Sequence, residues 1–418
     1  MEQISKKSPK PNKTKEKQKK EGESSSSKKK VKLLKKLKTP SNGPIILSIY
    51  LGTYEGKLIV NNINIKTKEN DSNFSFSSSP SAIRTIYHKL NSLFVSGTDE
   101  VIHMYNVHKK ISEGDLMTYS GTVNDIKIHD NYIIVAGENN TIPIWRMTDF
   151  NNIIELKGHK KGINSIDMHT TGGFLISGGR DNCVIIFDLL TGRKIEKFEF
   201  DYICNKVELF DKDKYLMVVF DLHIFILDLL KSGNQGNNNI IQKLNFNKKI
   251  INAYIVKNKL VAVFTDGEIK TYELNIKEEE NAQDKNDEGK DESQKNEDNE
   301  DKKNEKDKDA EDDKIVNISS ELRFILEKPA KKNENDLDIR VRFVSISKID
   351  KIKIITISYS NNEVYFYDLN KIIKFEQIES KKEDKNNVNE NHLIKKYGKI
   401  DYNIPGKITA LDTEFTRK

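Results

Sequence analysis

The chain carries a pattern of mostly apolar residues at positions i, i+3 and i+5, which predicts a β-strand and occurs seven times. The seven copies are Ile83/Ile86/His88, Val123/Ile126/Ile128, Ile163/Ile166/Met168, Cys204/Val207/Leu209, Ile251/Tyr254/Val256, Val341/Val344/Ile346 and Ile408/Leu411/Thr413. The seventh copy stands by itself near the end of the sequence, whereas a polar turn follows each of the other six.

The turns form a second pattern, in which an acidic or amide residue precedes a mostly aromatic residue by six positions. The pairs are Glu55/Asn61, Asp99/Tyr105, Asn139/Trp145, Asp181/Phe187, Asp221/Leu227, Asp266/Tyr272 and Asn361/Tyr367. Successive first members lie 44, 40, 42, 40, 45 and 95 residues apart. Two independent patterns therefore repeat together along the chain.

A period near 40–45 residues with one strand pair in each unit is typical of a β-propeller of the WD-repeat kind. We therefore predict an all-β fold with seven blades. The first turn pair has no inner-strand pattern before it, so the C-terminal copy is expected to complete the blade that contains residues 45–64. Closure of this kind removes open sheet edges, which would otherwise aggregate.

Charge divides the chain into three parts. Residues 1–40 hold 15 Lys against 4 Glu, a net charge of +11, whereas residues 277–314 hold 18 Asp or Glu against 9 Lys, a net charge of −9. Ordering the acidic stretch would cost about 1–2 kcal/mol of backbone entropy per residue and would bury little in return. We expect a disordered basic tail over residues 1–43 and a propeller over residues 44–418, interrupted by a disordered acidic insert at 277–314.

The cysteines and the apolar runs set limits on the compartment. Cys183 and Cys204 lie within strand patterns and have no disulfide or zinc spacing, so we expect small buried side chains in a reducing compartment. No run approaches the roughly 18 apolar residues of a transmembrane helix. The Lys-rich N-terminus has no apolar signal segment. We therefore expect no membrane partner.

The turn around Asp181 illustrates how a blade is stabilised. Gly178 and Gly179 are expected to let the backbone turn, and Asp181 to cap the turn by accepting hydrogen bonds. In WD repeats, a His, a Ser, an Asp and an aromatic residue form a buried group that structures the repeat. The corresponding residues here are His159, Ser177, Asp181 and Phe187. Phe187 lacks the indole N–H of the usual Trp, so the group is incomplete. The turn acids of three further blades are Asp99, Asp221 and Asp266.

The residue directly before each turn acid tends to face the rim of a WD-repeat propeller, where partners bind. Tyr54, Arg180 and Phe220 occupy this position and belong to types that are enriched in interface hot spots. They are the candidate partner-binding residues of the rim. Burial is the competing interpretation for Phe220, because the apolar run Tyr215–Phe220 leads into its turn.

The sequence contains no motif for catalysis or cofactor binding. It has no Gly-rich phosphate loop, no H-E-x-x-H helix and no nucleophile elbow. Its eight histidines are scattered without metal-ligand spacing. We expect no enzymatic activity, no cofactor, no metal site and no small-molecule substrate.

The basic tail holds a dense cluster of lysines. These are Lys28, Lys29, Lys30, Lys32, Lys35, Lys36 and Lys38. Such a cluster is typical of a nuclear or nucleolar import signal, and it is also suited to neutralising RNA phosphates. A solvated tail without either role remains the third interpretation.

Residues 96–123 show a more specific likeness than the repeat itself. They contain a Ser-Gly-Thr-Asp-Glu turn, a strand that ends at Tyr105, a Lys-Lys pair, and Gly-Asp-Leu followed by Gly-Thr-Val. This block, with Gly52-Thr-Tyr-Glu-Gly56, resembles the p21-activated-kinase-interacting-protein-like group of WD-repeat proteins. The resemblance covers roughly 45–275 and 338–418. Members of the group carry their Lys-rich tail at the C-terminus and lack an acidic insert, so the chain departs from the group in both respects.

The resemblance implies a nucleolar assembly factor for the large (60S) ribosomal subunit. We expect a monomeric scaffold in the nucleus and nucleolus, which holds a ribosomal or ribosomal-like protein of pre-60S particles and contacts pre-rRNA through its tail. A signalling scaffold that binds and regulates a p21-activated-type kinase is the alternative. An RNA-binding propeller with its own specificity would need exposed aromatic residues. A ubiquitin-ligase substrate receptor is disfavoured, because Leu190, Leu230 and Asn370 stand where such receptors often carry Arg.

Overall fold

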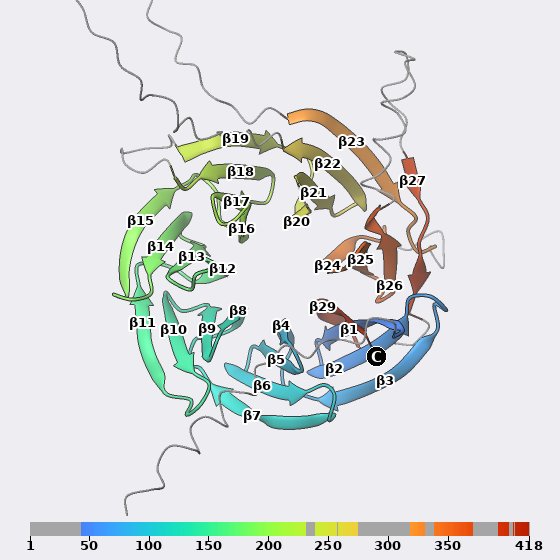
Figure 1. The fold of residues 1–418 in the computed structure, drawn as a ribbon, viewed down its shortest axis with the longest axis horizontal. Helices are drawn as coiled ribbons and strands as arrows, with labels where there is room; N and C mark the ends of the chain where they lie inside the picture. The colour runs from blue at the N-terminus through green and yellow to red at the C-terminus, as the bar shows by residue number, and fades with distance from the viewer. Residues whose placement is uncertain are drawn as a thin grey trace, which may run out of the picture. The chain divides into compact units, whose positions relative to one another are not determined.

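The computed structural model describes residues 43–230, 239–256, 258–274, 318–330, 338–370, 392–400, 404 and 406–417. Residues 44–416 form one compact unit, which is the subject of this subsection, and residues 1–43 with 417–418 are assigned to a second unit. The described residues of the first unit form seven sheets around a central channel, so the expected seven-bladed all-β propeller is confirmed (Figure 1).

Each sheet is built from consecutive antiparallel strands, except where the chain closes on itself and at the outer edges of the sixth and seventh sheets. The first sheet has the order β29 (Ile408–Arg417), β1 (Ile45–Thr53), β2 (Lys57–Asn64) and β3 (Asn70–Ser77). The second has β4 (Ile83–Lys89), β5 (Ser92–Gly97), β6 (Val101–Asn106) and β7 (Ile111–Met117). The third has β8 (Val123–His129), β9 (Tyr132–Gly137), β10 (Thr141–Arg146) and β11 (Asn152–Lys157).

The fourth sheet has β12 (Ile163–Met168), β13 (Phe174–Gly179), β14 (Cys183–Asp188) and β15 (Arg193–Glu199). The fifth has β16 (Lys206–Phe210), β17 (Tyr215–Val219), β18 (His223–Asp228) and β19 (Ile240–Asn245). The sixth has β20 (Ile250–Val256), β21 (Lys259–Phe264), β22 (Glu268–Leu274), β23 (Ile318–Leu326) and β27 (His392–Ile394). The seventh has β24 (Val341–Ile349), β25 (Ile352–Tyr359), β26 (Val364–Asp368) and β28 (Gly398–Lys399).

Closure of the ring joins the two ends of the sequence pattern. β29 lies beside β1 as the innermost strand of the first blade, as predicted. The backbone N–H of Tyr54 donates to the carbonyl oxygen of Lys407 over 2.7 Å, which fastens the start of β29 to the β1–β2 turn. The strand of the last repeat therefore pairs with that of the first, and the edge of β1 is covered.

The expected strand register is wrong by one residue in the sixth blade. Ile250 pairs with Phe264, two residues before Asp266, just as Ile163 pairs with the residue two before Asp181. The repeated pattern therefore starts at Ile250 rather than at Ile251. Ile250 and Ile251 are both apolar, so the periodicity of the sequence fits a strand that starts at either one. A shift of one residue moves every side chain of the strand to the other face of the sheet.

The hydrophobic core lies between neighbouring blades and not at the centre of the ring. One cluster joins the sixth and seventh blades and includes Val261, Phe324, Ile355 and Tyr367. Another joins the first and second blades through Tyr50, Val60 and Leu93. Each sheet buries both faces against its neighbours, which explains why the middle strands are continuous apolar runs.

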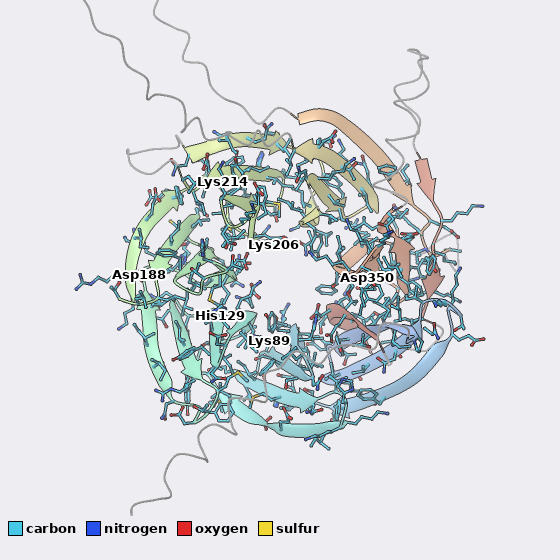
Figure 2. The ribbon with its side chains drawn as sticks, viewed as in Figure 1. Lys89, His129, Asp188, Lys206, Lys214 and Asp350 are labelled. Carbon is cyan, nitrogen blue, oxygen red and sulfur yellow. The ribbon has the colours of Figure 1, made fainter. Side chains whose placement is uncertain are left out.

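Side chains of the inner strands connect adjacent blades around the channel. The Lys89 ammonium donates to the Ile128 carbonyl oxygen over 2.9 Å, and the Lys206 ammonium to the Ala253 carbonyl oxygen over 2.7 Å. Figure 2 shows both lysines on the inner side of the ring. His88 of β4 lies 2.7 Å from Asp412 of β29, so the closing strand is held to the second blade by charge as well as by packing.

The outer edge of the sixth sheet has an arrangement that the repeat pattern did not predict. β27 follows β26 in sequence, but it pairs in parallel with β23 of the neighbouring blade, as Figure 1 shows. Glu327 accepts a hydrogen bond from the Lys396 N–H over 3.1 Å beside this crossing. The chain then returns to its own blade as the two-residue strand β28.

Candidate partner-binding face of the propeller

We define the upper face as the end of the ring that carries seven turns and the loops that lead into the inner strands. The turns are β1–β2, β5–β6, β9–β10, β13–β14, β17–β18, β21–β22 and β25–β26, and each contains one of the seven predicted turn acids or amides. Antiparallel pairing places the start of every inner strand at the same end as these turns. One face therefore receives two loops from each blade.

The structure brings together three members of the predicted buried group in the fourth blade. His159 Nδ1 lies 2.9 Å from Asp181 Oδ1, and His159 Nε2 lies 2.7 Å from Ser177 Oγ. The Lys160 N–H donates to the other Asp181 oxygen over 2.8 Å. Phe187 is buried beside the loop and offers no donor. The group fastens the entry loop of β12 to the β13–β14 turn and has a structural role.

The protonation states of this group follow from burial and hydrogen bonding. Burial lowers the pKa of His159, so the imidazole is neutral near neutral pH. Burial acts to raise the pKa of Asp181, but hydrogen bonds from the Lys160 N–H and from His159 outweigh it and lower the pKa. The carboxylate is therefore the charged acceptor of the group.

The third blade has the Trp that the fourth blade lacks, but it lacks other members of the buried group. It contains Trp145, but Val135 occupies the strand position that Ser177 has in the fourth blade, and Asn139 replaces the turn Asp. The indole N–H of Trp145 is buried and has no hydrogen-bond partner among the described residues. Neither blade thus assembles the complete buried group.

The other turn acids also bind the loop that enters their blade. Asp99 accepts from the Ser79 hydroxyl over 2.6 Å. Asp221 accepts from the Asn205 amide over 2.8 Å, and Asp266 pairs with Lys248. The four predicted acids therefore share one position and one function, with different donors.

Gly178 and Gly179 serve packing rather than the turn, which corrects the expectation for these glycines. Both lie within β13, and neither has a positive φ. A Cβ at Gly178 would lie 2.3 Å from Cys204 Sγ of the next blade. A Cβ at Gly179 would lie 2.6 Å from both His159 Nδ1 and Asp181 Oδ1. The glycines are required by the approach of the neighbouring blade and of the buried group.

The candidate rim residues divide into two that are exposed and one that is buried. The Tyr54 residue is 65% exposed, and the Arg180 side chain is 43% exposed with its Nε donating to Asn164 Oδ1. Phe220 is 0% exposed, so its assignment to the rim is wrong. Its N–H donates to the His223 carbonyl oxygen, which keeps Phe220 paired across a tight hairpin instead of at the turn apex.

Further exposed side chains of the upper face were not identified from the sequence. Tyr202 and Ile203, in the loop before β16, and Leu222, in the next turn, are exposed. The Tyr202 ring lies 4.2 Å from the His223 ring and 5.7 Å from the buried Phe220 ring. Tyr119, in the loop before β8, is also exposed. An alignment of the entry loops between blades would have revealed these positions, whereas the turn pattern does not include them.

The described residues bear on the expectations for metal ligands, cysteines and membrane spans. They contain no group of three or more His, Cys, Asp or Glu residues that could hold a metal ion. Cys183 and Cys204 are free and buried, as expected, and burial raises the pKa of both thiols. No helix in the described part of the chain is long and apolar enough to cross a membrane. The predicted lysine cluster 28–38 and the acidic insert 277–314 lie outside the described residues.

Comparison with known proteins supports the repeat assignment. The family model "WD domain, G-beta repeat" matches residues 150–188, which span β11 to β14 and include the His159–Ser177–Asp181 group. The chain is a seven-bladed propeller with a WD repeat. Propellers of this kind are typically non-catalytic scaffolds.

The relatives agree with the resemblance seen in the sequence. The chain is 27% identical over 195 residues to a p21-activated protein kinase-interacting protein 1-like protein of Danio rerio, a match that covers 44% of this chain and 49% of the relative. It is 24% identical over 187 residues to Protein MAK11 of Saccharomyces cerevisiae, covering 37% and 45%. It is 28% identical over 102 residues to the small ribosomal subunit protein RACK1 of Drosophila melanogaster, covering 24% and 32%. The first two matches span about half the length of these relatives.

Proposed function

We propose that this WD-repeat propeller is a scaffold for assembly of the large ribosomal subunit in the nucleolus. It holds a ribosomal or ribosomal-like protein of the pre-60S particle on its upper face, and its Lys-rich tail contacts pre-rRNA. The observation that carries the proposal is the likeness to Protein MAK11 and to the p21-activated protein kinase-interacting protein 1-like proteins, since the resemblance to this group implies large-subunit assembly.

The upper face supports a protein-binding role. Tyr54 and Tyr202 present large rings on loops that are fixed by backbone hydrogen bonds, and Arg180 adds a planar cation. Tyr and Arg are the residue types that most often provide binding energy at interfaces, because they combine area with hydrogen bonding at low entropic cost. The inter-blade links around the channel give these side chains a rigid support.

The basic tail supports an electrostatic contact with RNA. A segment with a net charge of +11 over residues 1–40 releases counterions when it binds phosphates, so its contribution to affinity falls steeply with salt. A protein contact through the upper face depends less on salt. The two contacts can thus be measured separately.

Sedimentation of the tagged full-length chain through sucrose gradients tests the proposal. At about 50 mM salt the chain is expected to co-migrate with large-subunit precursors and pre-rRNA, and at about 200 mM salt the association is expected to weaken. Deletion of residues 1–43 should remove most of this salt dependence. A chain that stays in light fractions at both salt concentrations contradicts the proposal and favours the kinase-binding alternative, which recovery of a kinase regulatory region from those fractions would support.

Paired substitutions test the face. Tyr54→Ala with Arg180→Ala should weaken the association at both salt concentrations, and most completely at about 200 mM salt, where the tail contributes least. The matched control is Tyr132→Ala with Arg193→Ala. These exposed residues have the same side-chain types, but they begin β9 and β15 and so lie at the end of the ring away from the upper face. Equal sedimentation of the two double variants would exclude Tyr54 and Arg180 from the contact.

A further inference from the structure

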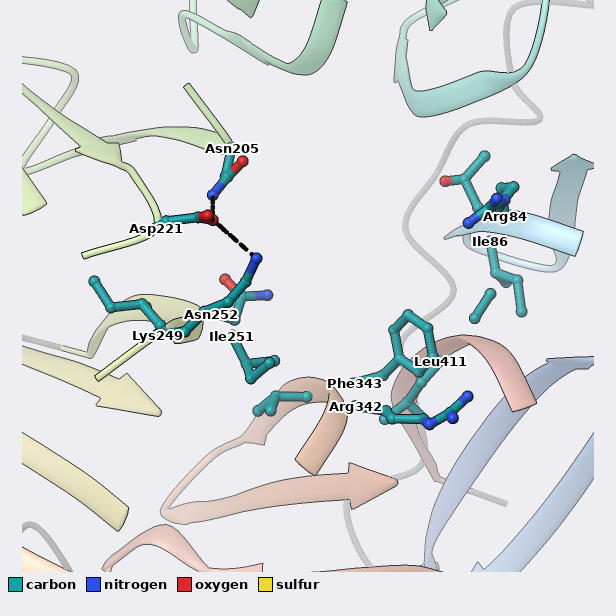
Figure 3. A pocket seen from close by; sticks show the side chains of 14 residues that line it. Arg84, Ile86, Asn205, Asp221, Lys249, Ile251, Asn252, Arg342, Phe343 and Leu411 are labelled. Atoms are coloured by element: carbon teal, nitrogen blue, oxygen red, sulfur yellow. Dashed lines mark hydrogen bonds and ion pairs between the residues drawn. The ribbon is translucent and has the colours of Figure 1, made fainter. Parts of the chain in front are cut away.

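A pocket of about 380 Å³ lies at the mouth of the central channel on the upper face. It is formed at the starts of inner strands from the second, sixth, seventh and first blades, and Asp221 and Asn205 of the fifth blade complete it. Figure 3 shows Arg342, Phe343 and Leu411 beside one another, Arg84 apart from them with Ile86, and Asp221 and Lys249 on the opposite side of the pocket. Its volume is near the lower end of the range of about 300–1,000 Å³ that is typical of ligand pockets.

A repeated β-bulge positions the two arginines. The pairing of five inner strands shifts directly after the first residue, and the bulge leaves one residue of each strand without a partner opposite. These residues are Arg84, Asn124, Asn164, Ile251 and Arg342. Of these five residues, Arg84, Ile251 and Arg342 line the pocket.

The asparagines at this position have a structural role that the arginines lack. The Asn124 amide donates to the Ile163 carbonyl oxygen, and the Asn164 amide to the Cys204 carbonyl oxygen, each over 2.8 Å. These bonds link one blade to the next. Neither Arg84 nor Arg342 forms a hydrogen bond or an ion pair with any described residue. Their guanidinium donors are available to a ligand.

The charge of the pocket is not balanced by its own residues. Asp221 accepts a hydrogen bond from Asn205 over 2.8 Å and pairs with Lys249 over 3.1 Å, so its carboxylate is already neutralised. The charged lining residues are Arg84, Lys249, Arg342 and Asp221, which leaves two positive charges uncompensated. Two guanidinium groups at one pocket favour a carboxylate ligand, because each can form paired N–H···O hydrogen bonds with it.

One part of the pocket lining, which we call the floor, is apolar. Ile86, Ile251, Phe343 and Leu411 line it and are only half-buried. A free phosphate or a phosphodiester would leave this apolar surface uncovered. A peptide that places an apolar side chain on the floor and carboxylates at the rim satisfies both parts of the pocket.

We propose that the channel mouth binds an acidic peptide segment of a protein partner, with an apolar side chain against Phe343 and Leu411 and separate carboxylates on Arg84 and Arg342. The inference rests on the proposed scaffold function and adds the chemistry of one partner segment. It concerns a site separate from the rim residues Tyr54 and Arg180.

Fluorescence anisotropy with the purified full-length chain tests the site. The probe is a labelled synthetic peptide with one phenylalanine between two runs of glutamate. Because the Lys-rich tail also attracts acidic peptides, two matched probes are needed, one with alanine for phenylalanine and one with glutamine for glutamate. The wild-type chain is expected to bind the first probe about tenfold more tightly than the alanine probe, since the ring would pack against Phe343 and Leu411.

Variants then assign the binding to the arginines. Arg84→Ala with Arg342→Ala should weaken binding of the first probe about tenfold or more and remove the preference over the alanine probe. Arg193→Ala serves as the control, and unchanged circular dichroism melting shows that the double variant is folded. Arg84→Lys with Arg342→Lys keeps the charge and should restore part of the affinity.

Three results would overturn the inference: equal affinity for the phenylalanine and alanine probes, equal affinity of the wild-type chain and the double alanine variant, or displacement of the probe by a short RNA oligomer from the chain that lacks residues 1–43. The gradient experiment is independent. Loss of peptide binding specificity with intact co-sedimentation contradicts this site only, whereas specific peptide binding by a chain found only in light fractions contradicts the ribosomal proposal only.

Discussion

Substitution of Asp181 by alanine removes the carboxylate that joins the entry loop of β12 to the β13–β14 turn. The carboxylate accepts from His159 Nδ1 over 2.9 Å and from the Lys160 N–H over 2.8 Å. The His159 side chain is 0% exposed, so water cannot replace its lost partner, whereas the Lys160 loop is exposed and can be rehydrated. A hydrogen bond to a charged group contributes about 1.5–3 kcal/mol, and an unpaired buried donor costs a similar amount. We expect a loss of about 3 kcal/mol in the free energy of unfolding.

Asp221 provides a matched control at the equivalent turn position of the next blade. Its side chain is 59% exposed, compared with 4% for Asp181. Its pairing with Lys249 is therefore a surface ion pair, for which about 0–1 kcal/mol is typical. Asp221→Ala should cost about 2 kcal/mol less than Asp181→Ala, although both remove a turn acid.

Equilibrium unfolding in guanidinium chloride measures the difference. The chain has one tryptophan, Trp145, in the blade next to Asp181, so its fluorescence reports unfolding together with circular dichroism. Coinciding transitions justify a two-state analysis. The pKa of Asp181 is lowered in the folded chain. The contribution of Asp181 to the free energy of unfolding is therefore fully present above the unfolded pKa of about 3.9, and it is lost as the pH falls through the folded pKa. The measurement belongs near neutral pH, and an equal or larger effect of Asp221→Ala would refute the reasoning.

Three further outcomes are expected. Burial acts to lower the pKa of His88, but the hydrogen bond to Asp412 and the charges of Asp412 and Glu414 raise it above 6.5. The contribution of His88 to the free energy of unfolding should therefore be complete below pH 6.5 and fade as the pH rises through the folded pKa. A His88→Gln variant with an unchanged profile of stability against pH would contradict this. Gly178→Ala should lower the melting temperature, because the added Cβ would lie 2.3 Å from Cys204 Sγ. Adding Cys204→Ala should restore part of the lost stability. If the second substitution restores nothing, the contact with Cys204 is not the cause. Deletion of residues 407–418 should yield aggregates in size-exclusion chromatography because it exposes the edge of β1, and a stable monomer would argue against the closure role of β29.

The repeat pattern was sufficient to predict the number of blades and the way the ring closes. Each turn acid sits between the two middle strands of its blade because a hairpin needs a turn residue at a constant distance from its strands, and this local spacing survives even where the rest of the motif is lost. The isolated C-terminal strand pattern and the first turn without one together indicated the pairing of β29 with β1. These inferences depend on distances along the chain, which the sequence contains.

The rim, the sixth-blade register and the channel mouth depend on neighbours in space. Phe220 has the same sequence offset as the exposed Arg180, but a tight hairpin and three surrounding aromatic rings bury it. Arg84 and Arg342 are 258 positions apart in numbering, and only ring closure through β29 brings their strands to either side of one innermost strand.

The sequence by itself therefore determined the period, the strands and the closure of this protein, because these follow from local backbone geometry and turn chemistry. Tertiary structure decided which side chains reach solvent, that Gly178 must lack a Cβ, and that β27 crosses to the neighbouring blade. The physical reason is that burial and charge balance are sums over residues from several blades. A local sequence pattern does not specify which residues of other blades become neighbours when the ring closes.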